Sequence, residues 1–188
     1  RAIENGGRDA ILVTASGCGT SLKDYGHLLR HDPEWAGPAA KVSVLAQDIS
    51  EFVAMAGLPP VMERPGLAVA YHAACSLQHG QRIRDQPKAL LRAAGFEVRE
   101  PAQAHLCCGS AGVYNILQPD LASQLRENKL QTLHALTPAA VVTGNIGCLT
   151  QLRLGARVPV LHTVELLDWA TGGPRPASLQ REAGEEAS

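Results

Sequence analysis

The chain has 188 residues, enough for one domain or slightly more, and 45% of them are hydrophobic, enough for a proper core. Its formal net charge of −1 argues against a nucleic-acid or other polyanionic partner. No apolar run approaches the ~20 residues of a membrane-spanning helix, and the five cysteines are an odd number that does not make a set of disulfides.

The first sixty residues are predicted to form a strand and two helices. Residues 10–14 (AILVT) are short, apolar and rich in β-branched side chains, which favours a buried parallel strand. A turn at 15–20 precedes a short helix over 21–30. A second helix is expected from about Asp48 to Ala56, before the Gly-Leu-Pro-Pro segment that follows.

The next hundred residues alternate between strands and helices. Helices are expected within 81–94, where Pro87 marks a break or a start, and from Pro119 onward. Strands are predicted at 67–71, 96–99, 140–143 and 158–161. This alternation indicates an α/β fold with parallel sheets and flanking helices.

Two further features are a lysine on an apolar helix face and a polar C-terminal segment. Lys129 falls on the apolar face of the helix that begins at Pro119, and we expect its side chain to snorkel towards solvent. From Gly172 onward Pro, Ser, Gly and Glu dominate, so residues 172–188 are predicted to be a disordered tail.

The beginning of the chain repeats its end. The segment GCGTSL at 17–22 corresponds to GCLTQL at 147–152, and VSVL at 42–45 with the helix after it corresponds to VPVL at 158–161 with the helix after that. We therefore expect two tandem units. Residues 1–62 are the second half of a first unit, and residues 63–171 are a complete second unit. The first unit is incomplete, so the chain is expected to be the C-terminal piece of a longer protein.

Adjacent cysteines at 107 and 108 are the chemical centre of the sequence. Neighbouring thiolates point in different directions, so a single tetrahedral ion suits them poorly, whereas a cluster of several irons gives each thiolate its own metal. Gly109 and Gly112 allow the backbone to approach such a cluster closely and to offer N–H groups to its sulfurs.

Two more cysteines, Cys75 and Cys148, each follow a predicted strand. The carboxyl ends of parallel strands meet at one edge of a sheet, which is where open α/β sheets place their sites. We therefore predict four thiolate ligands: Cys75, Cys107, Cys108 and Cys148. A zinc site is the metal alternative, although its usual CxxC pairs are absent, and inert buried cysteines are the remaining alternative.

Other polar residues near the cysteines are weaker candidates. Cys18 corresponds to Cys148 through the repeat, so it is a candidate ligand of a second site whose other residues are not in this chain. His72, His79 and His105 flank the cysteines, and satisfied side chains near turns are expected for each in preference to ligands. The chain shows no dinucleotide fingerprint and no hydrolase constellation.

Three segments carry a resemblance to a known family: YHAACSLQHGQ at 71–81, HLCCGSAG at 105–112 and GNIGCL at 144–149. The chain resembles the CCG cysteine-rich domains, written C…CCG…CxxC, found in heterodisulfide reductase and in iron–sulfur subunits of flavin-linked dehydrogenases, among which the glycolate oxidase type is the nearest match. The last cysteine of that pattern is replaced here by Gln151, and Ser21 has the equivalent place in the first half-unit. Four cysteines fit an ordinary [4Fe–4S] cubane, or a non-cubane site lacking one ligand.

The resemblance implies an electron-transfer subunit of an oxidoreductase, inactive alone, with no hydride-abstracting base of its own. Electrons would come from FAD on a flavin-containing glycolate oxidase subunit and pass to a membrane or quinone acceptor. A ferredoxin-like domain with two [4Fe–4S] clusters would precede this chain, and the protein would be cytoplasmic, with peripheral attachment at the inner membrane face as an option. The alternatives are a heterodisulfide-reductase-type thiol/disulfide subunit, a lactate or glycerol-3-phosphate dehydrogenase iron–sulfur subunit, and a zinc-bearing or cluster-free scaffold.

Overall fold

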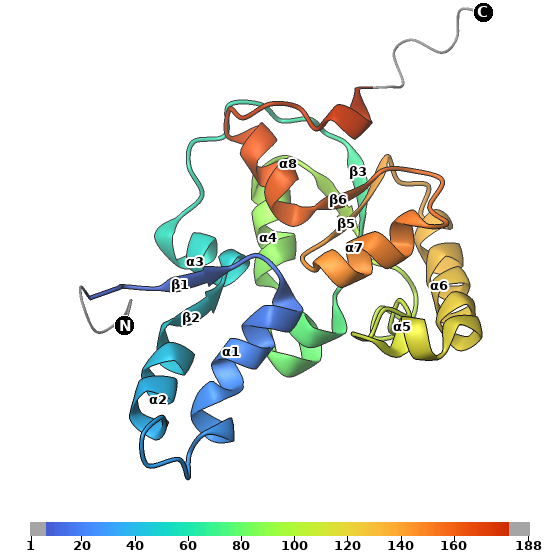
Figure 1. The fold of residues 1–188 in the computed structure, drawn as a ribbon. Coiled ribbons are helices and arrows are strands. Elements are labelled where there is room, and N and C mark those ends of the chain that lie inside the picture. The colour runs from blue at the N-terminus through green and yellow to red at the C-terminus, as the bar shows by residue number, and fades with distance from the viewer. Residues whose placement is uncertain (1–6, 181–188) are drawn as a thin grey trace, which may run out of the picture.

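The computed structural model describes residues 7–180, which form an α/β fold with two parallel sheets (Figure 1). No helix in this part of the chain is long and apolar enough to cross a membrane. The first sixty residues contribute β1 (Ile11–Val13), α1 (Ser16–Leu28), α2 (Ala36–Leu45), β2 (Ala46–Asp48) and α3 (Ile49–Ala56). The remainder contributes β3 (Ala68–Tyr71), the π-helical turn η1 (Ser76–Gly80), α4 (Gln86–Ala93), β4 (Glu97–Arg99), α5 (Tyr114–Leu117), α6 (Pro119–His134), β5 (Ala140–Thr143), α7 (Ile146–Arg153), β6 (Val160–His162), α8 (Thr163–Ala170) and the 3₁₀ turn η2 (Ala177–Leu179).

The larger sheet has four parallel strands in the order β4-β3-β5-β6. Val69 of β3 lies opposite Val98 of β4 and Ala140 of β5, and Val142 of β5 lies opposite Leu161 of β6. The strand β5 is buried along its whole length, as expected for a central parallel strand covered on both faces. The four strands predicted for this part of the chain are therefore confirmed, with ends that differ by one or two residues.

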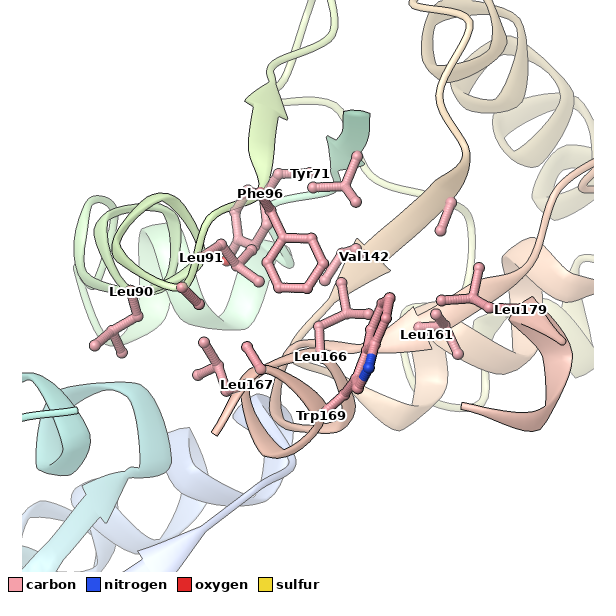
Figure 2. Close-up of a cluster of buried hydrophobic side chains, with 14 residues drawn as sticks. Tyr71, Leu90, Leu91, Phe96, Val142, Leu161, Leu166, Leu167, Trp169 and Leu179 are labelled. Carbon is pink, nitrogen blue, oxygen red and sulfur yellow. The ribbon is translucent and has the colours of Figure 1, made fainter. Parts of the chain in front are cut away.

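One face of this sheet is covered by α4 and α8 (Figure 2). Alternate strand residues point to this side, and they meet leucines of both helices together with two aromatic rings. The rings of Phe96 and Trp169 pack edge to face, with centroids 6.0 Å apart. The helix α4 starts with Pro87 in its first turn, and Gly95 follows its end with φ of +92°, as the sequence predicts.

The opposite face of the sheet is covered by α6 and α7. Here the strand residues Ala70, Val141 and Val160 meet Leu133 of α6 and Leu152 of α7, both of which are fully buried. Two of the cysteines, Cys108 and Cys148, belong to this same cluster of buried side chains. The thiols are therefore held by the core of the domain, where a rigid frame fixes their positions.

The first sixty residues form a smaller layer around the two-stranded sheet β1-β2. The helix α1 packs against α2, and Gly26 permits close contact because the backbone of Ala40 faces the place that a side chain would take. Residues 42–45, which the repeat aligned with a strand, are instead the last turn of α2. The β-branched Val42 and Val44 suggested a strand, but the antiparallel contact with α1 determines the local structure.

The structure contains the repeat, but the strands β2 and β6 correspond with a shift of two residues from the correspondence predicted from the sequence. The strand β2 corresponds to β6, so Asp48 matches His162, two residues along from the alignment made on the sequence. Both residues are N-caps of the following helix in a capping box, with Glu51 and Glu165 completing it. The two units therefore share a strand, a cap and a helix at equivalent places.

Residues 172–180 pack against the core, which differs from the disordered tail predicted for 172–188. Leu179 is buried in the core beside α8, and the Arg175 guanidinium lies over the ring of Trp169 at 5.4 Å from its centroid. A single well-placed leucine and a cation–π contact anchor this polar segment. The remaining residues of the predicted tail, 181–188, lie outside the described residues.

Candidate metal centre

The candidate centre lies at the carboxyl ends of β3 and β5, which are neighbours in the sheet. Cys75 follows β3 and Cys148 follows β5, so the two thiols reach the same edge, as the sequence predicts. Together with Cys107 and Cys108 they line one open pocket of about 440 Å³. The four predicted ligands are thus brought together by the fold.

The loop 105–112 brings Cys107 and Cys108 to this edge. Gly109 has φ of +90°, and a side chain there would strike the backbone carbonyl of Ala122 in α6. The Gly109 N–H donates to the Cys107 sulfur at 3.3 Å. Glycine is therefore needed both for the turn and for the close approach of this loop to α6.

The fourth thiol belongs to a helix N-terminus. Cys148 is the third residue of α7, and Asn145 caps that helix by accepting from the Gly147 N–H at 3.4 Å. The side-chain amide of Asn145 also donates to the Cys148 sulfur at 3.7 Å. A helix N-terminus favours negative charge, so this placement stabilises a thiolate or an anionic group bound to it.

The four thiols lie close enough to one another to shift each other's pKa. Contacts with the thiols of Cys108 and Cys75 lower the pKa of Cys107, and the contact with Cys108 lowers the pKa of Cys148. The same contacts raise the pKa of Cys75, mainly through Cys107, and raise the pKa of Cys108, through Cys107 and then Cys148. Four thiolates cannot coexist here without cationic charge, which metal ions would supply.

The spread of the donors distinguishes a cluster from a single ion. Within residues 7–180, one group of three candidate metal-binding side chains has its donor atoms all within 4.8 Å of one another: His72, Cys108 and Cys148. Cys75 and Cys107 also line the pocket but lie outside that tight group. Four thiols around a hollow suit a multi-iron group better than one tetrahedral zinc.

His72 is a residue whose importance the sequence analysis underestimated. It follows β3, its backbone N–H donates to the Val142 carbonyl at 2.8 Å, and its side chain is 1% exposed. Both ring nitrogens lack a hydrogen-bond partner among the described residues, contrary to the expectation of a satisfied side chain. An unpartnered buried imidazole beside two sulfurs is suited to donate to a sulfur or to bind metal. The other flanking histidines, His79 and His105, are exposed and line a neighbouring surface pocket.

Cys18 lies at the same pocket rather than at a separate one. It is the third residue of α1, as Cys148 is of α7, so the predicted turn at 15–20 is in fact the first turn of a helix. Contacts between the first sixty residues and the rest of the chain, here called the seam, hold α1 at this place. The hydroxyls of Ser16 and Ser76 are 2.7 Å apart, and His162 Nε2 lies 2.7 Å from the Thr14 carbonyl. Cys18 is exposed, and Ser21 also lines the pocket.

Gln151, which replaces the last cysteine of the family pattern, does not line the pocket. Its side chain is buried, and its amide donates to the Ala122 carbonyl at 3.2 Å, joining α7 to α6. This is the same carbonyl that Gly109 approaches. The substitution therefore serves packing, and the four remaining thiols of this unit are the donors available.

Lys129 is placed differently from the sequence-based expectation. Its side chain does not snorkel to solvent: the residue is 2% exposed, and its ammonium donates to the Gln103 carbonyl at 2.9 Å. The position of Lys129 on an apolar helix face was the feature of the sequence that could have indicated its burial. A lysine that is buried on such a face needs a compensating negative charge.

Comparison with known proteins agrees with this geometry. Residues 69–153 match the family model of the CCG cysteine-rich domain. Over 164 residues the chain is 42% identical to the glycolate oxidase iron-sulfur subunit of Escherichia coli (strain K12), covering 87% of this chain and 40% of that protein. It is 33% identical over 175 residues to a probable glycolate oxidase iron-sulfur subunit of Bacillus subtilis (strain 168), covering 87% of this chain and 39% of that one.

A more distant relative is lactate utilization protein A of Anoxybacillus flavithermus, 27% identical over 165 residues, covering 84% of this chain and 69% of that protein. The chain spans about two fifths of the length of the two glycolate oxidase relatives. The resemblance read from the cysteine segments is thereby confirmed.

Proposed function

We propose that this chain is part of an iron–sulfur electron-transfer subunit of a glycolate-oxidising complex. The premise is that residues 69–153 match the cysteine-rich domain of the CCG type. The observation that carries the proposal is the convergence of four thiols on one pocket at the carboxyl edge of a parallel sheet. The 42% identity to a protein named as such a subunit supports the substrate class.

Cys75, Cys107, Cys108 and Cys148 would hold the cofactor, which we propose to be a [4Fe–4S] cluster. Such a group supplies reversible one-electron transfer when bound. The chain's own residues then have defined tasks. The Gly109 N–H and the Asn145 amide donate to ligand sulfurs, and the N-terminus of α7 faces the anionic site. Cys18 at the pocket edge is an auxiliary thiol that the cluster does not require.

The hydride chemistry is assigned to another subunit. We propose that FAD on a flavin-containing partner oxidises glycolate and that electrons reach the pocket from there, before they pass to a membrane or quinone acceptor. A ferredoxin-like region with further clusters would complete the path, consistent with the chain spanning about 40% of its relative. The chain alone is therefore expected to be inactive, and the assembled protein would work in the cytoplasm or at the inner membrane face.

A lactate-oxidising complex is the second candidate, favoured by the similarity to lactate utilization protein A. The higher identity of 42%, against 27%, supports glycolate as the first candidate. A heterodisulfide-reductase type of chemistry is less well supported, because Gln151 is turned into the helix interface and leaves this unit with four thiols.

Metal and sulfide analysis after anaerobic reconstitution tests the cofactor. We expect about four irons and four sulfides per chain, with visible absorption and an EPR signal after reduction. Cys108→Ser should lose most of the iron, whereas Cys18→Ser, the matched control at the pocket edge, should keep it. Full occupancy in the Cys108→Ser variant would contradict the ligand set, and stoichiometric zinc without iron would favour the zinc alternative.

A dye-reduction assay tests the role in the complex. Glycolate-dependent reduction should require the flavin-containing subunit in addition to the full-length iron–sulfur subunit, and lactate should be compared in parallel. Reduction of the dye by this chain with glycolate alone would refute the electron-transfer assignment. A higher rate with lactate would favour the second candidate.

A further inference from the structure

Lys129 is a buried cation in the second half of α6, next to residues that pack in the core. Its residue is 2% exposed, like the neighbouring Leu130 and Leu133, which are 5% and 0% exposed. An ammonium removed from water in this way is strongly destabilising unless an opposite charge compensates it. The compensation must come from groups close to its terminal nitrogen.

The polar surroundings of Lys129 contain one neutral partner. The ammonium donates to the Gln103 carbonyl at 2.9 Å, and no ion pair with a carboxylate is found for it among residues 7–180. Lys88, by contrast, is paired with carboxylates: its ammonium lies 3.0 Å from Glu100 and 3.2 Å from Asp85. A carbonyl dipole alone does not balance a buried unit charge.

The cysteine thiols are the candidates for this anionic partner. Lys129 and Cys107 line the same small hollow between α6 and the loop 103–107, with a volume of about 30 Å³. Burial lowers the pKa of Lys129, while Cys108, Cys107 and Cys148 act in the opposite direction. A four-thiolate cluster carries net negative charge and gains more on reduction, so a fixed cation beside it stabilises the reduced form.

We propose that Lys129 is the countercharge of the cysteine site, a positioning residue that holds the loop 103–107 and makes a cluster bound there easier to reduce. This inference rests on the proposed function, since it requires a cluster at the four thiols. A fixed unit charge close to a site of low effective dielectric constant changes a one-electron equilibrium by about tenfold. Tenfold corresponds to a shift of about 59 mV for one electron.

The test compares variants of the chain reconstituted anaerobically with iron and sulfide. Lys129→Met removes the charge at similar length, Lys129→Arg keeps the charge, and Lys88→Met makes the same change in net charge at a lysine already neutralised by carboxylates. Iron content is measured first, and the midpoint potential is then obtained by titration with dithionite while the visible spectrum is followed.

We expect Lys129→Met to keep its iron and to shift the potential downwards by about 59 mV, with Lys129→Arg and Lys88→Met close to the wild type. If Lys129→Met binds no iron while Lys129→Arg binds a full complement, the charge is required and the inference stands. It is overturned if Lys129→Met has the wild-type potential, or if both Lys129 variants lose iron or shift equally. Absence of iron from the wild-type chain would instead refute the proposed function.

Discussion

The contact between the Gly109 turn and α6 allows one prediction to be worked out in detail. Gly109→Ala adds a single methyl group at a residue with φ of +90°, and that methyl meets the backbone carbonyl of Ala122. Gly112 is the matched control in the same loop, because it has φ of +64° but nothing lies within 4 Å of the place where a side chain would be. The two variants share backbone strain and differ in the clash.

The expected magnitudes follow from these two terms. Left-handed backbone costs a residue with a side chain about 1–2 kcal/mol, and forced overpacking adds about 1–3 kcal/mol. Gly112→Ala should therefore lose about 1 kcal/mol of unfolding free energy and Gly109→Ala about 3 kcal/mol. For a chain of this size these losses lower the thermal midpoint by roughly 3 °C and roughly 10 °C.

The assay is thermal unfolding of the two variants followed by circular dichroism, with iron content after reconstitution as a second readout. Because Gly109 directly follows the ligand pair, Gly109→Ala should also bind less iron than Gly112→Ala. Equal thermal midpoints for the two variants would show that α6 moves away from the added methyl group without a loss of unfolding free energy. The argument that the loop is fixed by close backbone contact would then fail.

Three further predictions address the tail, the surface and the site. Leu179→Ala should lower the free energy of unfolding by about 2 kcal/mol in urea titrations, whereas no change would show that the tail contact is weak. Burial, and to a smaller extent Arg157, lower the pKa of His134 below 6.5. The free energy of unfolding that depends on the neutral imidazole is therefore fully present above pH 6.5 and is lost as the pH falls through the folded-state pKa. The urea midpoint should therefore fall on acidification, and less so in His134→Gln. His72→Phe should keep iron but alter the EPR signal of the reduced chain, unlike the exposed control His79→Phe, and an unchanged spectrum would exclude contact between the imidazole and the cluster.

Sequence patterns were sufficient to predict the larger sheet and the meeting of Cys75 and Cys148 at its edge, because both depend on local signals. Short apolar runs such as Ala140–Thr143 are buried parallel strands, and cysteines just after them necessarily meet at the strand ends. The segment Ala36–Leu45 was harder to predict, since its valines suit a strand and its helical state depends on packing against α1.

The parts of the site that could not be predicted depend on contacts between distant segments. Cys18 reaches the pocket because Ser16 contacts Ser76, sixty residues away, and nothing local to the GCGT sequence indicates that contact. Lys129 was visible on an apolar face, but whether a lysine there extends to solvent or turns inward depends on the loop at Gln103. Burial in these cases results from the tertiary fold.

The seam between the two units has a consequence for how the protein matures. The pocket wall comes from both sides of the seam, because Cys18 of α1 and Cys148 of α7 both line it, and hydrogen bonds of Ser16 and His162 cross the seam. A group that binds the pocket only when both sides of the seam are in contact stabilises that contact by mass action. A cofactor that contacts both sides would therefore couple its own binding to the association of the two sides.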